Sequence, residues 1–82
     1  MLNTLLRLPA VRAQSGYSRS TIYLRITQGL WTRPVSLGAR SVAWPAAEVA
    51  ALNAARIAGQ GEAEIRALVT KLQAARALAL AA

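Results

Sequence analysis

The chain has 82 residues, enough for one small domain, and a domain of this size has little room for a deep substrate cleft. It contains no cysteine and no histidine, which excludes disulfides, thiolate metal sites and the commonest general base. Only three carboxylates occur, at Glu48, Glu62 and Glu64. We therefore expect a protein that is not an enzyme, with no catalytic residue, metal site, cofactor or small-molecule substrate.

Positive charge is concentrated in the first half of the chain. The net charge is +7, and residues 1–44 contain six arginines and no acidic residue. Arginine makes bidentate contacts to phosphate and guanine, so we expect double-stranded DNA as the partner. Two alternatives remain open: the arginines only solubilise a surface of unusually uniform charge, or they bind an acidic protein or membrane surface.

The apolar start of the chain does not have the pattern of a targeting or membrane segment. Arg7 and Pro9 interrupt it and no basic region precedes it, so we expect no signal peptide. No apolar run approaches the roughly 20 residues that span a bilayer. We expect a cytoplasmic protein, at the bacterial nucleoid, without a membrane partner.

A first short helix is predicted over Leu8–Ser15. Pro9 suits its first turn, and Gly16 is placed to end it. Leu8 and Val11 are expected to face the core.

A second helix is predicted over residues 18–28. Ser18 is a good N-cap residue and Gly29 a good stop. Ile22 and Ile26 form the inward stripe, and at about 100° per residue the outward residues are Ser20, Leu24, Thr27 and Gln28, with Arg19 and Tyr23 on the shoulder. Two short helices joined by a glycine-containing turn are typical of a helix-turn-helix.

A small hairpin is predicted next, with strands over residues 33–37 and 41–44 and a turn over residues 38–40. Arg40 lies at its tip. Alternation groups Val35 with Leu37, and Val42 with Trp44. A hairpin directly after a recognition helix is a wing, so we expect residues 33–44 to contact DNA backbone beside that helix.

A third helix is predicted from Pro45, in the first turn, to about Ala58, with Val49 and Leu52 packing on Trp44 and Ile22. Glu48 lies in that first turn, where it is favourable against the helix dipole. Residues 59–61, Gly-Gln-Gly, form a linker.

The last helix is predicted from Glu62 to about Leu80. Its apolar positions alternate in steps of three and four: Ile65, Leu68, Leu72, Ala75 and Ala79. This spacing is typical of a short coiled coil, which would form a homodimer or an array on DNA through residues 62–80, or of a face packed on the same chain; both alternatives stay open. Three cations are expected on the solvated face: Arg66, Lys71 and Arg76.

The predicted fold is mainly α with a small β-hairpin, a winged helix-turn-helix with an additional C-terminal helix. The predicted domains are residues 1–58 for DNA binding, 59–61 as linker and 62–82 as a C-terminal helix, for which self-association is one of the two open alternatives. The aromatic Trp31 is assigned to the core with Trp44 and Val49.

Several runs in this order resemble one known family. They are LPAV at 8–11, GYSRSTIY at 16–23, RPVSLGAR at 33–40, VAW at 42–44, EV at 48–49 and AARI at 54–57. Together, over residues 6–58, they are similar to the AlpA family of small prophage-associated transcriptional regulators. The resemblance implies a winged helix-turn-helix related to MerR-like and excisionase folds, and a transcriptional regulator of a phage or mobile element. An alternative from the same resemblance is an excisionase-like factor that bends DNA during recombination.

The resemblance also implies which residues contact DNA. Groove or phosphate contacts are expected on the recognition helix, and Arg40 is the expected residue of the wing. The family usually has Tyr-Arg-Leu-Ile where this chain has Tyr23-Leu24-Arg25-Ile26, so Leu24 would meet a thymine methyl and Arg25 would reach a phosphate. The predicted DNA-binding residues are Arg19, Ser20, Thr21, Tyr23, Leu24, Arg25, Thr27, Arg33 and Arg40. For Tyr23, a half-buried position with its hydroxyl bound to water is the alternative.

Overall fold

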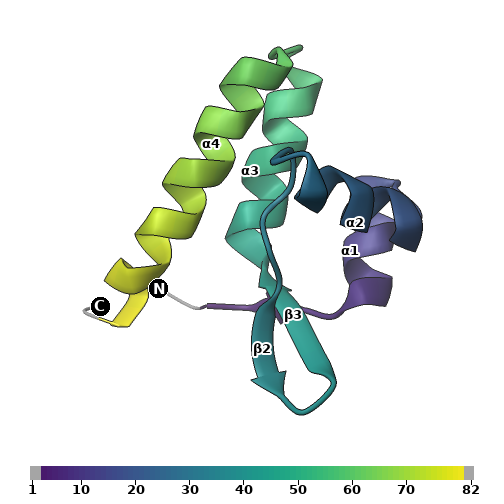
Figure 1. Cartoon of the computed structure of the whole chain (residues 1–82), viewed down its shortest axis with the longest axis vertical. Helices are drawn as coiled ribbons and strands as arrows, with labels where there is room; N and C mark the ends of the chain where they lie inside the picture. The colour runs from purple at the N-terminus through teal and green to yellow at the C-terminus, as the bar shows by residue number, and fades with distance from the viewer. Residues whose placement is uncertain (1–2, 81–82) are drawn as a thin grey trace.

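The computed structural model describes residues 3–80, so residues 1–2 and 81–82 of the predicted domains lie outside it. These residues form four α-helices and a three-stranded antiparallel sheet of order β1-β3-β2 (Figure 1). In chain order the elements are β1 (Leu5–Leu6), α1 (Leu8–Ser15), α2 (Arg19–Thr27), β2 (Val35–Gly38), β3 (Ser41–Pro45), α3 (Ala46–Ile57), α4 (Glu62–Ala75) and a 3-10 turn, η1 (Arg76–Leu80). The mainly α fold class predicted from the sequence, with two short helices, a hairpin and a further helix pair, is confirmed.

Local signals set the bounds of α1 and α2. Gly16 ends α1 in the left-handed conformation, with φ of 76°, and its N–H donates to the carbonyl of Arg12, a conformation that glycine adopts without steric cost. Ser18 caps α2 because its Oγ accepts from the N–H of Thr21 at 3.2 Å. Both helices lie where the sequence predicted them.

The sheet contains a strand that the sequence did not predict. Leu5 and Leu6 of β1 pair with Pro45 and Trp44 of β3, and the N–H of Ala46 donates to the carbonyl of Thr4 at 2.8 Å. A strand of two residues is too short to show alternation, so the predicted hairpin is one part of a three-stranded sheet.

The hairpin itself is displaced slightly from its predicted bounds. Strand β2 begins at Val35 rather than at residue 33, and β3 continues to Pro45. Pro45 is consequently the N-cap residue of α3 and not a residue of its first turn. The reason is the pairing of Pro45 with β1, which keeps it extended.

The core lies between the sheet and all four helices. Trp44 and Ile22 are fully buried, and the indole N–H of Trp44 donates to the carbonyl of Thr32 at 2.9 Å. Trp31 is also buried and packs edge-on against Tyr17, with ring centroids 5.8 Å apart. The predicted core residues that are buried are Val11, Ile22, Trp31, Trp44, Val49 and Leu52.

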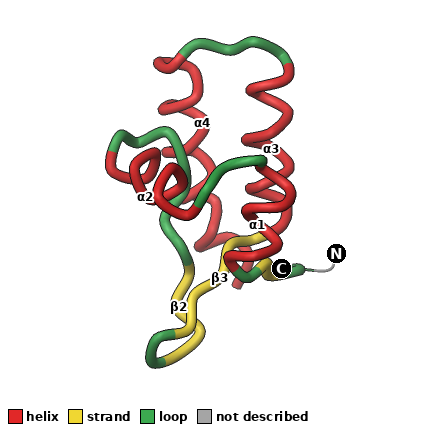
Figure 2. The backbone as a smooth tube through the Cα atoms, turned by 90° about the vertical axis from the view of Figure 1, so that its right-hand side faces the viewer, coloured by secondary structure: helices red, strands yellow, loops and turns green. Residues whose placement is uncertain are grey.

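Helix α4 packs back along α3, and the two run side by side in both views (Figures 1 and 2). Ile65 and Val69 of α4 are buried in the common core, and Leu68 and Leu72 pack against it. The α-helix ends earlier than predicted, at Ala75, which is exposed. Packing on the same chain thus accounts for the apolar face of α4 up to Leu72, while the side chain of Ala79 lies outside the described residues.

Candidate nucleic-acid interface

The outward face of α2 matches the prediction. Ile22 points into the core, and Ser20, Leu24 and Thr27, which lie on the opposite side of the helix, are exposed. Leu24 keeps 53% of its surface accessible. The hydroxyl of Thr27 donates to the carbonyl of Tyr23 at 3.1 Å, so the Thr27 hydroxyl makes its donor hydrogen bond within α2.

One shoulder of α2 faces the hairpin. Tyr23 is half-buried and meets Trp44 of β3 edge-on, with ring centroids 6.3 Å apart. The guanidinium of Arg19 lies over the Tyr23 ring, 5.3 Å from its centroid. This cation–π contact restricts the rotamers of an exposed arginine and holds its charge on the hairpin side of α2.

Thr21 and Arg25 occupy the other shoulder of α2, away from the hairpin. Thr21 belongs to the N-cap of α2, because its hydroxyl accepts from Ser18 Oγ at 3.0 Å. Arg25 folds back over the ring of Tyr17, at 5.8 Å, and its Nη1 donates to Gln28 Oε1 at 3.4 Å. Both side chains are directed toward their own helix and its neighbours rather than outward.

The β2–β3 hairpin projects away from the helices in both views (Figures 1 and 2). Arg40 lies at its tip, exposed, with a φ of 61°. This left-handed conformation costs a residue other than glycine about 1 kcal/mol. Arg33 is also exposed, but it precedes β2 and lies at the base of the hairpin.

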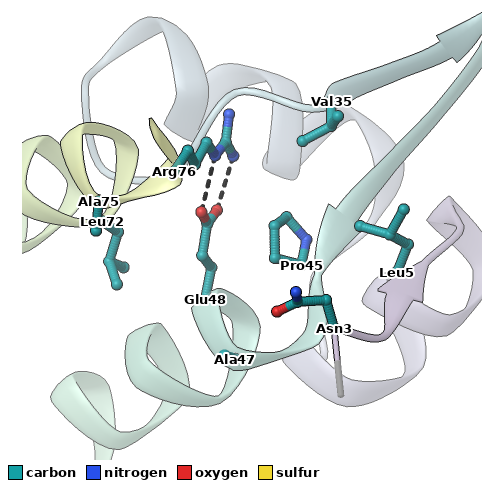
Figure 3. A pocket seen from close by; sticks show the side chains of 9 residues that line it. All are labelled: Asn3, Leu5, Val35, Pro45, Ala47, Glu48, Leu72, Ala75 and Arg76. Carbon is teal, nitrogen blue, oxygen red and sulfur yellow. Dashed lines mark hydrogen bonds and ion pairs between the residues drawn. The ribbon is translucent and has the colours of Figure 1, made fainter. Parts of the chain in front are cut away.

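Glu48, the carboxylate nearest to these arginines in sequence, is paired with another arginine, Arg76. Glu48 is 5% exposed and accepts two hydrogen bonds from Arg76, from Nε at 2.8 Å and from Nη2 at 2.7 Å (Figure 3). Glu62 and Glu64 begin α4, at the end of the α3–α4 pair away from the hairpin (Figure 1). The surface of α2 and the hairpin is therefore basic without an opposing exposed acid.

The predicted solvated face of Arg66, Lys71 and Arg76 is wrong at Arg76, the C-cap residue of α4, whose side chain is only 25% exposed. Its ion pair with Glu48 links residues 28 positions apart in the chain, which helical periodicity cannot reveal. Arg66 is half exposed but donates from Nε to the carbonyl of Gln28 at 2.9 Å. Lys71 is exposed as predicted.

The Glu48–Arg76 pair lines a mostly apolar hollow of about 430 Å³, between the sheet and the end of α4 (Figure 3). Its two charged groups are bonded to each other. Among residues 3–80, no three carboxylates lie close enough together to hold a metal ion. In the same range, no helix is long and apolar enough to cross a membrane.

Residues 4–57 match the family described as "Prophage CP4-57 regulatory protein (AlpA)". The chain belongs to the AlpA family. The resemblance found from the sequence is thus confirmed, and the matched residues of this AlpA-family protein contain α2 and the hairpin but not α4. A regulatory family points to a role other than catalysis.

The protein is also similar to "Uncharacterized protein ORF88" of Enterobacteria phage P4. The two are 51% identical over 55 residues, which are 67% of this chain and 62% of the relative. This AlpA-family chain therefore matches less than two thirds of the length of that phage protein. No solved structure matches the chain.

Proposed function

We propose that this AlpA-family protein is a sequence-specific DNA-binding regulator of prophage or mobile-element genes, acting at the bacterial nucleoid. The observation that carries the proposal is the exposed face of α2, with Arg19, Ser20 and Leu24, placed beside a projecting hairpin that ends in Arg40. In this arrangement α2 is the recognition helix in the major groove and the hairpin is the wing of a winged helix-turn-helix.

The contacts divide by chemistry. Arg19 lies at the start of α2, where recognition helices meet base edges, and suits the O6 and N7 atoms of guanine. Leu24 is placed for a thymine methyl. Tyr23 and Arg40 suit phosphates on either side of the groove. Thr21 and Arg25 hold the conformation of α2 instead, since their side chains contact Ser18 and Tyr17.

The direct test is selection of bound fragments from host and phage DNA at physiological salt. A single module of this size contacts few base pairs, so we expect recovered sites to contain a short motif in two or more copies. Equal recovery of all fragments, with affinity lost as salt rises, would refute sequence-specific recognition and leave only a backbone-binding protein.

Replacement of Arg19 by alanine should weaken binding to the selected site by about 1–3 kcal/mol if the guanidinium reads a base. Binding to random DNA should fall much less. Arg56→Ala is the matched control, because it removes the same charge from an exposed position of α3. Titrations of both variants on both DNAs measure the effect, and equal losses on the two DNAs would assign Arg19 to the phosphate backbone.

Replacement of Arg40 by glycine should separate stability from DNA binding. Glycine relieves the left-handed strain at φ 61°, so the free energy of unfolding should stay unchanged or rise by up to about 1 kcal/mol. Affinity for DNA should fall, and the salt dependence of binding should lose about one phosphate contact. Unchanged affinity at all salt concentrations would remove Arg40 from the interface.

Bending of DNA during recombination is the second candidate function. It is favoured by Leu37, an apolar residue on the projecting hairpin that is 46% exposed, because apolar wedges between base steps kink DNA. A circular-permutation gel assay on the selected site distinguishes the two roles. Position-dependent mobility that disappears in Leu37→Ala would support bending, and uniform mobility would exclude it.

A further inference from the structure

Helix α4 is hydrogen-bonded to both ends of the segment that connects α2 to β2. At the first end, Arg66 Nε donates to the carbonyl of Gln28, the C-cap residue of α2, at 2.9 Å. At the second end, Gln73 Oε1 accepts from the N–H of Arg33 at 2.8 Å. Arg76 Nη2 donates to the carbonyl of the same Arg33 at 2.6 Å. The side chains of α4 and of Arg76, the C-cap residue that follows it, therefore hold the main chain at the end of one element of the proposed interface and just before the other.

The contacts at the first end include close packing. Gly29 has a φ of 77°, and the side chain of Arg66 lies 3.7 Å from the point where a Cβ on Gly29 would lie. Between the two ends, Leu30, Trp31 and Thr32 are buried. The connecting segment is thus fixed in its middle by the core and at its ends by α4.

The second end is anchored to α3 as well. Arg76 bonds Arg33 through Nη2, and both its Nε and its Nη2 bond the buried carboxylate of Glu48 on α3. Gln73 and Arg76 are three residues apart, so they lie on the same side of the helix. Movement of Arg33 relative to α3 would have to break its bond to Gln73, and either its bond to Arg76 or the bonds of Arg76 to Glu48.

We propose that α4 is a brace that fixes the orientation of the β2–β3 hairpin relative to α2, with Arg66, Gln73 and Arg76 as positioning residues for specific DNA recognition. The proposal deepens the function proposed above and rests on it. Base readout needs the helix and the hairpin to meet the duplex at the same time, and a hairpin that must be ordered on binding costs affinity. Phosphate contacts to random DNA carry no sequence information, so they should depend less on a fixed orientation of the hairpin.

The main test variant is Gln73→Met, which removes the acceptor of the Arg33 N–H without changing the charge of the protein. Gln60→Met is its control, because Gln60 is exposed in the turn between α3 and α4. Hydrogen exchange of the amides of Arg33 and β2 should become about fivefold to tenfold faster in Gln73→Met, the change expected from loss of one hydrogen bond. Exchange in α3 should match that of the control, which distinguishes loss of the brace from a general loss of stability.

DNA binding supplies the second measurement. The ratio of specific to random affinity should fall about fivefold in Gln73→Met and remain unchanged in Gln60→Met. Arg66→Met should lower the same ratio, whereas Lys71→Met, which removes the same charge from an exposed position of the same helix, should lower affinity for both DNAs equally. Arg76→Ala would not isolate the contact with Arg33, because it also breaks the ion pair with Glu48.

The proposal would be overturned if the exchange rates and affinity ratios of Gln73→Met and Arg66→Met stayed within the range of the two controls, Gln60→Met and Lys71→Met. If the unmodified protein shows no preference for any DNA, the proposed function fails, and the exchange of Arg33 and β2 decides whether α4 braces the hairpin. Faster exchange with an unchanged affinity ratio would also overturn the proposal, since the brace would then have no part in recognition.

Discussion

Replacement of Arg76 by alanine is expected to lower the free energy of unfolding by about 3–5 kcal/mol, the cost of leaving one member of a buried ion pair without its partner. Glu48 is 5% exposed, and both of its carboxylate oxygens bond Arg76. The variant also frees the carbonyl of Arg33, 2.6 Å from Nη2. Denaturant unfolding followed by circular dichroism measures the loss, which is a large fraction of the about 5–15 kcal/mol typical of a domain.

The paired variant Glu48→Leu with Arg76→Met is the informative control. Replacement of both members of a buried ion pair by apolar side chains of similar volume is often neutral or stabilising, so this variant should be far more stable than Arg76→Ala. Lys71→Ala should change stability by less than about 0.5 kcal/mol, because Lys71 is an exposed cation of α4, the helix that precedes Arg76. A loss below about 1 kcal/mol in Arg76→Ala would mean that water reaches Glu48 in place of the guanidinium.

Replacement of Trp44 by alanine is expected to cost about 3–5 kcal/mol, as for other buried tryptophans. The side chain is fully buried, pairs with Tyr23 of α2, and donates its indole N–H to the carbonyl of Thr32 at 2.9 Å. Its backbone also pairs with Leu6 of β1. The side chain therefore contacts both α2 and the segment before the hairpin.

Trp44→Phe divides this effect into packing and hydrogen bonding. Phenylalanine keeps an aromatic ring but leaves the Thr32 carbonyl without its donor, which should cost about 1–3 kcal/mol. Leu37→Ala, at an exposed position of the same hairpin, should stay within about 0.5 kcal/mol of the unmodified protein. Trp31 fluorescence and circular dichroism report the unfolding. Equal stability of Trp44→Ala and Leu37→Ala would contradict the placement of Trp44 in the core.

Much of the local structure could be predicted because its causes lie within a few residues. Gly16 and Gly29 supply the left-handed positions that follow α1 and α2, with φ of 76° and 77°, and Ser18 supplies the cap of α2. The period of 3.6 residues places Ile22 inward and Leu24 outward, as observed. The family could be recognised for a similar reason, since its motifs are contiguous runs within residues 4–57.

The side of α2 on which each predicted DNA-binding residue lies relative to the hairpin depended on tertiary packing. Arg19 and Arg25 both flank the outward face of α2. One lies over Tyr23 beside the hairpin, and the other over Tyr17 on the opposite shoulder. Helical periodicity gives an angle around the axis, but it does not say which shoulder the hairpin approaches. Only the packing of Tyr23 on Trp44 decides that.

The sequence by itself determined the helices, the hairpin, the basic character of the first half and the family. Tertiary structure alone decided that β1 completes the sheet, that Arg76 neutralises Glu48, and that α4 holds the segment between α2 and β2. The physical reason is the separation of the partners. The side chains of Arg66, Gln73 and Arg76 bond residues 28 to 43 positions away, whereas propensity, capping and periodicity act within about one or two helical turns.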